Sequence, residues 1–263
     1  MAGNNRSSLV VQERDLRLFE ALETMRVMDR EQAKIVTGFG STTRANARLL
    51  ALTQAGLLRR FFLGTGGAGR KALYWLSAKG AQFVGVPRRG PRRPQDALIA
   101  TDFFVEHQLA VNRAYCALKF GPAPTPGVAF QRWIGFYRAI APDLGLIPDG
   151  YVEFTTPAGT VAMFIEVDLG NENLGVWKKK VGLYLQLALS GEYERRFGQS
   201  RFRVLVVATS ERRLLTIRKV IAGTTDKVFW FASLESVERD GAFGRIWLRP
   251  KSDERQPLIQ EPR

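Results

Sequence analysis

The first 86 residues carry two kinds of hydrophobic periodicity in succession. Apolar side chains recur every three to four positions, the spacing of amphipathic helices, in three segments: 13–27, 29–36 and 41–56. Two runs with the patterning of β-strands, 57–63 and 71–77, then flank the glycine-rich stretch GTGGAGR, and a short helix is expected in AKGAQFVGV. Three helices followed by a two-stranded hairpin predict a winged helix-turn-helix domain over residues 1–86.

The remainder of the chain has a mixed pattern that predicts an α/β domain, so the fold class as a whole is α+β. Prolines and arginines in PRRGPRRP cannot continue a helix, and residues 87–95 are therefore expected to be a linker. The domain over residues 96–249 is predicted to hold a long helix, three strands, a helix, a strand, a helix and a strand, at 96–120, 128–134, 150–156, 161–168, 172–189, 202–209, 210–223 and 227–234.

Two pairings within this domain follow from the connections. The tight link PAGT predicts an antiparallel hairpin of 150–156 with 161–168. The strand that follows the helix at 172–189 is expected to run parallel to a central strand. Residues 250–263 are polar and contain prolines, and we expect them to be a frayed tail.

Charge indicates what this protein binds. The formal net charge is +14 and the pI about 10.4, values that favour a polyanionic partner, most often nucleic acid. Residues 1–98 hold 17 Lys and Arg against 7 Asp and Glu, whereas the rest hold 22 against 18. The predicted partner is double-stranded DNA, bound mainly by the first third of the chain.

Cysteine content and hydropathy exclude several other classes of protein. The single cysteine, Cys116, excludes an internal disulfide and a cysteine-based zinc site. The chain has no apolar run of 18 residues and no signal peptide at its start, so no membrane association is expected. These features predict a soluble, cytoplasmic protein.

The segment 41–56 is the expected recognition helix, because the second helix of a helix-turn-helix lies in the major groove. Its polar residues are of the types that contact bases and phosphates: Ser41, Thr42, Thr43, Arg44, Asn46 and Arg48. Basic residues of the hairpin tip and of the linker are expected to contact the DNA backbone or the minor groove: Arg70, Lys71, Arg88, Arg89, Arg92 and Arg93. Winged helices also dock proteins, but the charge favours DNA here. Because one such domain contacts few base pairs, we expect a homodimer formed through residues 96–263.

Three carboxylates fall near one another in the predicted sheet. Asp149 follows Pro148 at the start of a strand, and Glu166 and Asp168 share one face of the hairpin partner because they are two residues apart. Such a cluster suits Mg²⁺ or Mn²⁺, which could activate water against a phosphodiester, with a lysine from Lys178–Lys180 to stabilise the transition state. Alternatively, Glu166 and Asp168 are only the polar end of a buried strand, and their spacing does not decide between the two.

The order of the motifs IPDG, FIEVDLGNE and KKKVGLYLQL resembles PD-(D/E)XK nucleases. More closely, the chain resembles the replication-relaxation family of plasmid and mobile-element proteins, through YWLSAKGAQFV, FFVEHQLAVNRAYCAL, PDG, FIEVDLGNE, a lysine four residues before a tyrosine, and FRVLVVATSERR. This resemblance covers residues 13–235. It implies a winged helix joined to a PD-(D/E)XK-like domain, and a role in plasmid replication, DNA relaxation or regulation.

Carried over by position, the resemblance assigns catalytic roles to Asp149 and Glu166 as the two acids of the motif. The motif's lysine, two residues after the glutamate, is replaced by Asp168. Lys180, on the following helix, is the candidate substitute. Glu106, beside the only histidine His107, is a possible further acid.

Two functions therefore stay open at this point. In the first, the protein binds DNA in replication, relaxation or transcription control, and its nuclease-like domain is structural. In the second, it is a Mg²⁺-dependent DNA endonuclease targeted by its winged helix. An adaptor that recruits other proteins through the α/β domain is a remoter third, and the missing lysine favours the first.

Overall fold

The computed structural model describes residues 9–65, 69–87 and 102–259, and the chain divides into two compact units, 1–112 and 113–263. The division falls within helix α6 (Asp102–Lys119), later than the predicted boundary at residue 96. The predicted linker at 87–95 lies outside the described residues, apart from residue 87.

The first unit contains the helices and the hairpin that the hydrophobic pattern predicted. In chain order it comprises α1 (Glu13–Met25), α2 (Arg30–Thr37), α3 (Thr42–Gln54), β2 (Leu58–Thr65), β3 (Gly69–Leu76) and α4 (Ala78–Phe83). A two-residue strand, β1 (Met28–Asp29), pairs with β3 and gives an antiparallel sheet of order β1-β3-β2. The periodicity missed β1 because two residues are too few to show an alternation.

Side-chain caps fix where two of these helices begin. Asp29 accepts a hydrogen bond from the backbone N–H of Gln32 at 2.9 Å and so begins α2, and Ser41 caps α3 in the same way. The left-handed Gly38 ends α2, since that conformation suits glycine. The short turn between Gly38 and Ser41 thus sets α3 against α2.

The first part of α6 packs into the first unit. Val105 and Leu109 are buried against Val27 and Leu73, and the side-chain amide of Asn112 donates to the carbonyls of Met25 and Val27 at 3.2 and 2.6 Å. This contact explains why the first compact unit extends beyond the hairpin and α4.

The second unit is built on a seven-stranded sheet of order β10-β9-β8-β7-β6-β5-β4. Its strands are β4 (Ala129–Ile134), β5 (Gly150–Thr156), β6 (Gly159–Asp168), β7 (Arg203–Ala208), β8 (Phe229–Ser233), β9 (Trp247–Arg249) and β10 (Ser252–Gln256). The β5–β6 hairpin and the parallel β6–β7 pair are as the sequence predicted, and β7 and β8 are also parallel.

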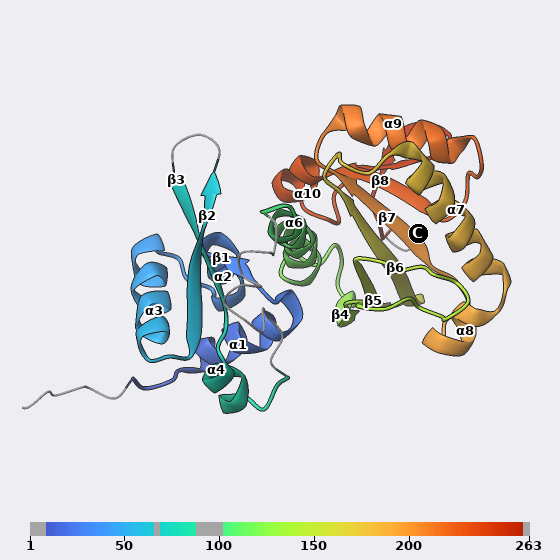
Figure 1. The fold of residues 1–263 in the computed structure, drawn as a ribbon. Helices are drawn as coiled ribbons and strands as arrows, with labels where there is room; N and C mark the ends of the chain where they lie inside the picture. The colour runs from blue at the N-terminus through green and yellow to red at the C-terminus, as the bar shows by residue number, and fades with distance from the viewer. Residues whose placement is uncertain (1–8, 66–68, 88–101, 260–263) are drawn as a thin grey trace, which may run out of the picture. The chain divides into compact units, whose positions relative to one another are not determined.

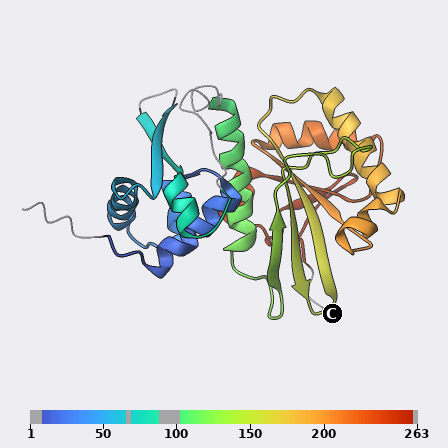
Figure 2. The ribbon, with the colours of Figure 1, turned by 60° about the horizontal axis from the view of Figure 1, so that its bottom comes forward.

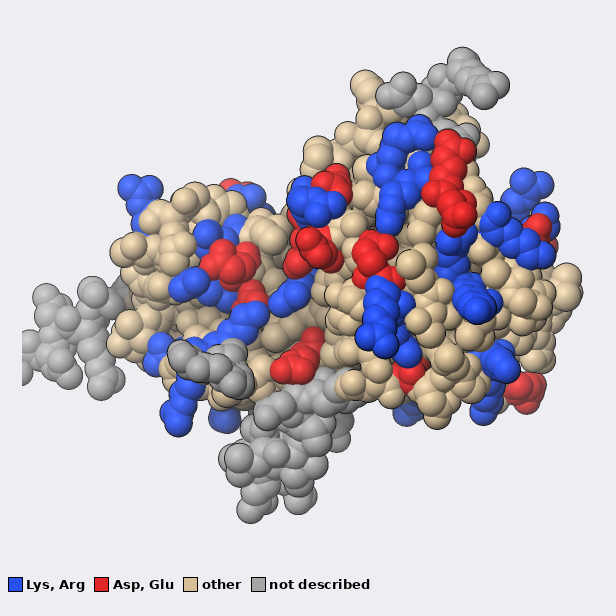
Figure 3. Space-filling model, turned by 90° about the horizontal axis from the view of Figure 1, so that it is seen from above, with Lys and Arg blue, Asp and Glu red and all other residues tan. Residues whose placement is uncertain are grey.

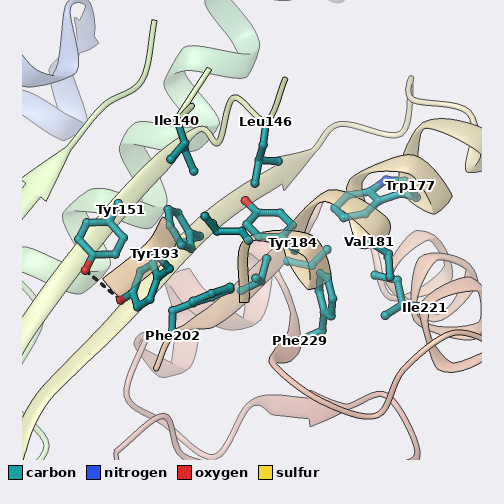
Figure 4. Close-up of a cluster of buried hydrophobic side chains, with 14 of the residues drawn as sticks. Ile140, Leu146, Tyr151, Trp177, Val181, Tyr184, Tyr193, Phe202, Ile221 and Phe229 are labelled. Atoms are coloured by element: carbon teal, nitrogen blue, oxygen red, sulfur yellow. Dashed lines mark hydrogen bonds between the residues drawn. The ribbon is translucent and has the colours of Figure 1, made fainter. Parts of the chain in front are cut away.

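Helices cover one face of this sheet. Figures 1 and 2 show α7 (Leu174–Leu189), α8 (Glu192–Phe197) and α9 (Glu211–Ala222) on the same side. Under them lies an aromatic core that includes Trp177 and Tyr184 of α7 (Figure 4), and the Tyr184 ring centroid lies 5.8 Å from that of Phe229 of β8. Ala162 and Phe164 of β6 face this core, so Glu166 and Asp168, which continue the same alternation, point under the helices as well.

The C-terminal segment differs from its prediction. Residues 250–263 were expected to be frayed, but within 250–259, the part that the structure describes, β10 pairs with β9 and Leu258 is fully buried. Arg218 of α9 holds this segment by donating to the carbonyls of Arg249 and Ser252 and to the Asp253 carboxylate. The prediction was wrong because these partners come from elsewhere in the chain. The short helices α8 and α10 (Leu234–Asp240) were also missed.

None of the helices in the described part of the chain has the length and apolarity needed to span a membrane.

Candidate functional site

The carboxylates that the sequence singled out lie at the end of β6. Glu166 and Asp168 are each 1% exposed. Asp149 stands just before β5, where its Oδ2 accepts the backbone N–H of Val167 at 2.7 Å and its own N–H donates to the carbonyl of Ile165. The antiparallel hairpin therefore brings Asp149 against the same end of β6 as the other two acids.

Both carboxylate oxygens of Glu166 are engaged by α7. Oε2 lies 2.9 Å from Nζ of Lys180, and Oε1 accepts a hydrogen bond from the Tyr184 hydroxyl at 2.6 Å. Lys180 and Tyr184 are four residues apart and so share one face of the helix. Lys180 also contacts Oε1 of Glu172 at 3.0 Å. The structure thus places Lys180, one of the candidate residues, beside Glu166.

Burial and charge act in opposite directions on this pair. Burial raises the pKa of Glu166 to about 7, the Lys180 ammonium opposes that rise, and the Asp149 charge adds to it. Burial would lower the pKa of Lys180, but Glu166 and Glu172 raise it above its ordinary value. The pKa of Tyr184 is also raised, first by burial and then by Glu166. At neutral pH the ammonium and the phenol are therefore both protonated donors to Glu166.

Asp168 belongs to a different cluster. Its two oxygens accept hydrogen bonds from Nε and Nη2 of Arg213, each at 2.7 Å, and Oδ2 also accepts the indole N–H of Trp177 at 2.8 Å. The backbone N–H of Gly170 completes the set at 2.7 Å. Burial would raise the pKa of Asp168, but the hydrogen bonds from Arg213 and Trp177 outweigh it and lower the pKa. Asp168 is thus a carboxylate held in its charged form by a bidentate arginine.

This arrangement does not fit the expected three-carboxylate metal site. Mg²⁺ requires short, near-octahedral contacts to free oxygens. Here Lys180 and Tyr184 take the oxygens of Glu166, Arg213 and Trp177 take those of Asp168, and one oxygen of Asp149 accepts a backbone N–H. Among the residues that the structure describes, no group of three or more His, Cys, Asp or Glu side chains could hold a metal ion. The expectation that Asp168 joins Asp149 and Glu166 in one pocket is therefore corrected, because Arg213 draws it to α9.

The other candidate residues, Lys178, Lys179 and Glu106, are exposed. Lys178 and Lys179 are exposed, so only Lys180 of the three lysines turns toward Glu166. Glu106 is exposed on the part of α6 that belongs to the first unit. The sequence analysis did not identify Arg213 and Trp177 as the partners of Asp168. The i, i+4 spacing of Lys180 and Tyr184, which both contact Glu166, is visible in the sequence.

In the first unit, part of α3 faces an open hollow. This hollow, of about 640 Å³, is lined by Thr43, Asn46, Ala47 and Leu50 of α3, by Arg60, Arg70, Lys71, Ala72 and Tyr74 of the hairpin, and by Asp29, Arg30 and Glu31. Thr43, Arg44, Asn46, Arg60 and Arg70 are exposed. The structure thus brings two of the predicted α3 residues, Thr43 and Asn46, to one surface with the predicted hairpin residue Arg70.

Other predicted DNA-contacting residues have structural partners. Nε of Arg48 donates to Asp15 at 2.9 Å, and its Nη2 donates to the same carboxylate and to the carbonyl of Val10. Nζ of Lys71 lies 2.6 Å from Oδ2 of Asp29. The prediction that Arg48 reaches a base is corrected, because that face of α3 turns toward the buried Asp15 of α1.

Three further groups complete the comparison with the predicted interface. Ser41 is occupied as the cap of α3. Thr42 accepts a hydrogen bond from Nζ of Lys34 at 3.1 Å. The predicted linker contacts, Arg88, Arg89, Arg92 and Arg93, lie outside the described residues.

Comparison with known proteins assigns this chain to a family. The pattern of the replication-relaxation family matches residues 19–200, which is more than half of the chain. The chain belongs to the replication-relaxation family. The match includes α3, the hairpin, Asp149, Glu166 and Lys180, and it ends before β7.

Two further comparisons add little to the family assignment. No curated protein matches the chain. A solved structure of the restriction endonuclease FokI aligns with 86% of this chain and 43% of its own, at 13% identity and a TM-score of 0.29. That level of similarity assigns no activity to this replication-relaxation protein.

The Arg48–Asp15 pair leads to a prediction for stability. Arg48→Ala should lower the free energy of unfolding because it leaves the buried Asp15 carboxylate without its cation. The decrease should lie at the lower end of the roughly 3–5 kcal/mol that breaking a buried ion pair costs. Arg44→Ala, on the exposed side of the same helix, is the matched control and should change stability by less than about 0.5 kcal/mol. Urea unfolding of both variants measures this, and equal stabilities would contradict the structural role of Arg48.

The Glu166–Lys180 pair predicts a pH-dependent effect. Because the folded-state pKa of Glu166 is raised from 4.5 to about 7, its contribution to stability is fully present below about pH 4.5 and is lost as the pH rises through 7. Lys180→Met should therefore destabilise the protein by roughly 3–5 kcal/mol at pH 8 and by less at pH 5.5, where Glu166 can take up a proton.

Two companion variants isolate this interaction. Lys179→Met, one position away and exposed, should have little effect at either pH. Adding Glu166→Gln to Lys180→Met should recover stability at pH 8, since it removes the unpaired charge. Thermal melts that show the same loss at both pH values would exclude the charge of Glu166 as its cause.

Proposed function

We propose that this replication-relaxation protein binds duplex DNA of a plasmid or mobile element through a winged helix in its first unit, and that its nuclease-like second unit does not cleave DNA. The observation that carries the proposal is the common exposed surface of α3 and the hairpin, where Thr43 and Asn46 face Arg60 and Arg70. Its role lies in replication, relaxation or transcription control.

The order of elements in the first unit supports this mode of binding. In a helix-turn-helix, the second helix enters the major groove with its first residues toward the bases. α3 follows α2 after a short turn, and its first turns expose Thr43, Arg44 and Asn46. Asparagine pairs well with adenine and arginine with guanine, so α3 offers the side chains that sequence recognition requires.

Local geometry supports the proposal better than net charge does. On the face drawn in Figure 3, Lys and Arg side chains lie among Asp and Glu side chains. The net charge of +14 adds a general attraction to DNA, but it does not select a surface. The exposed basic residues of β2 and β3 do select a surface, because Arg60 and Arg70 border the same hollow as Asn46.

The second unit is proposed to bind or assemble rather than to cut. A metal-dependent nuclease uses carboxylate oxygens to hold its ions, and in this chain the oxygens of Glu166 and Asp168 serve buried ion pairs. We also expect a homodimer formed through the second unit, since a two-fold pair reads two half-sites about 34 Å apart or a multiple of that.

The DNA-binding surface is tested with the full-length protein and duplex DNA. Asn46→Ala and Arg44→Ala should each relax sequence preference by roughly 1–3 kcal/mol. Arg60→Ala and Arg70→Ala should weaken binding to all sequences alike and reduce the slope of log K against log salt by about 0.9 each. Fluorescence anisotropy titrations at several salt concentrations measure both effects.

Arg59→Ala is the matched control for Arg60→Ala. The two arginines are exposed neighbours on β2, but a strand points successive side chains to opposite faces, and only Arg60 borders the hollow. Affinity should be unchanged in Arg59→Ala. If Arg59→Ala and Arg60→Ala weaken binding equally, the contact is a general charge effect and α3 with the hairpin is not the binding surface.

The proposed loss of catalysis is tested by nicking assays. Wild-type protein incubated with supercoiled, linear and single-stranded DNA in Mg²⁺ or Mn²⁺ should leave the DNA intact, and neither ion should raise the melting temperature, because an ion that binds only the folded state would do so by mass action. Metal-dependent nicking that disappears in Asp149→Ala and Glu166→Ala would overturn the proposal and establish an endonuclease targeted by the winged helix.

A further inference from the structure

A basic hollow lies at the opposite end of the second unit's sheet from Glu166 and Asp168. It has a volume of about 620 Å³ and opens where β6, β7 and β8 begin. The parallel register pairs Met163 with Arg203 and Asp168 with Ala208, so about five residues, or roughly 17 Å of strand, separate the hollow from the carboxylates. It is therefore a separate site from the one already described.

The lining of this hollow is basic. Its charged side chains are Arg201, Arg203, Lys227 and Arg249, and the described residues that border it include no Asp or Glu. Near its rim, Nζ of Lys227 lies 3.6 Å from the Asp226 carboxylate, and Arg249 donates to the backbone carbonyl of Asp226 at 3.1 Å. The hollow thus gathers more positive charge than its surroundings offset.

Two of these arginines lie against the same indole ring. The guanidinium carbons of Arg203 and Arg249 are 4.8 and 4.6 Å from the ring centroid of Trp230, which is 5% exposed. Burial lowers the pKa of Arg203, and the charge of Arg249 lowers it further. Each guanidinium gains a cation–π contact, but two like charges on one ring repel each other.

Two buried donors at this site have no hydrogen-bond partner in the described structure. They are the indole N–H of Trp230 and the Nε–H of Arg249. Buried polar groups are rarely left without a partner, and each such group in a native protein calls for an explanation. An anion in the hollow could accept these donors and also offset the repulsion between the two arginines.

The backbone at the edge of the hollow is unusual. Val228 has a φ of 47°, in the left-handed region that β-branched residues seldom adopt. Its carbonyl accepts the N–H of Val204 at 2.8 Å, which ties this turn to β7. The turn places Lys227 on the rim of the hollow, so the strained residue serves to position a basic side chain.

We propose that this hollow, the β7–β8 basic pocket lined by Arg201, Arg203, Lys227, Trp230 and Arg249, binds a phosphate group carried by a nucleotide or by nucleic acid. Guanidinium groups match phosphate oxygens through paired N–H donors, and stacking on Trp230 fixes the orientation of two of them. Arg201, Arg203, Lys227 and Arg249 all follow residue 200, where the match to the replication-relaxation family ends, so family membership does not assign this site.

The experiment uses the full-length protein with inorganic phosphate, a deoxynucleoside triphosphate and duplex DNA as separate probes. The melting temperature of the wild type should rise with at least one of them at constant ionic strength. Arg249→Gln should weaken that binding by roughly tenfold or more, since a hydrogen bond to a charged group is worth about 1.5–3 kcal/mol. Arg245→Gln is the control, because Arg245 is exposed and paired only at the surface with Glu254, and it should bind like the wild type.

A second variant and a second readout separate binding from folding. Lys227→Gln removes an exposed side chain and should weaken binding several-fold while the protein stays folded. Arg249→Gln without ligand at low salt should melt at or above the wild-type temperature, because it removes one of two like charges, whereas an arginine needed only for structure would lower it with and without phosphate. The fluorescence of Trp230 should change on binding, and Trp230→Phe should abolish that change.

The three probes identify where the phosphate comes from. Tight binding of the triphosphate that Arg249→Gln abolishes, with duplex binding unchanged, identifies a nucleotide. A loss of duplex affinity in Arg249→Gln beyond that in Arg245→Gln identifies the nucleic-acid backbone. If no probe raises the wild-type melting temperature, or if Arg249→Gln and Lys227→Gln both bind like the wild type, the pocket is not a phosphate site.

Discussion

The rest of the structure depends on one constraint, that every buried carboxylate needs a cation beside it, and the ion pair of Glu166 with Lys180 is an example. A carboxylate taken out of water is costly unless a cation and hydrogen-bond donors replace its hydration. In the described part of the chain, each buried carboxylate has such a partner: Asp15 has Arg48, Asp29 has Lys71, Glu153 has Arg132, Glu166 has Lys180 and Asp168 has Arg213. These pairs hold helix to helix, hairpin to helix, strand to strand and helix to sheet.

This constraint also decides which basic residues remain for binding. Arg48 and Lys71 stand in segments whose composition suits DNA, yet both are committed to buried acids. Asn46, Arg60 and Arg70 border the exposed hollow in the same unit, and the proposed interface rests on them. In the second unit, Glu166 and Asp168 likewise anchor α7 and α9 through Lys180 and Arg213.

The β7–β8 basic pocket is the exception to this pattern. Arg203 and Arg249 are half-buried, yet both lie against the ring of Trp230, and among the described residues neither forms a salt bridge with a carboxylate. Where the fold needs a charge for its own stability, it supplies the counter-charge from within the chain. A place where it gathers like charges and leaves buried donors without partners is one where a ligand would complete the structure. The end of the sheet that holds Glu166 and Asp168 is thus self-neutralised, and the opposite end is not.

The sequence by itself determined the longer helices, the strands of the two hairpins and the place of Asp149 and Glu166 at one end of the second hairpin, because hydrophobic periodicity, caps and short links act between neighbours in the chain. The tertiary structure alone decided which side chain neutralises which. Arg48 of α3 meets Asp15 of α1 across 33 positions, and Arg213 of α9 meets Asp168 of β6 across 45, so the first contact depends on which helices pack together and the second on which helix packs on which strand. The order β9-β8-β7-β6 likewise brings Arg249, Trp230 and Arg203 together from three strands. Backbone pattern is set by neighbours in the chain, whereas compensation of buried charge is a property of packing. For that reason the sequence did not predict that Arg213 pairs with Asp168, nor that a basic pocket lies at the opposite end of the sheet.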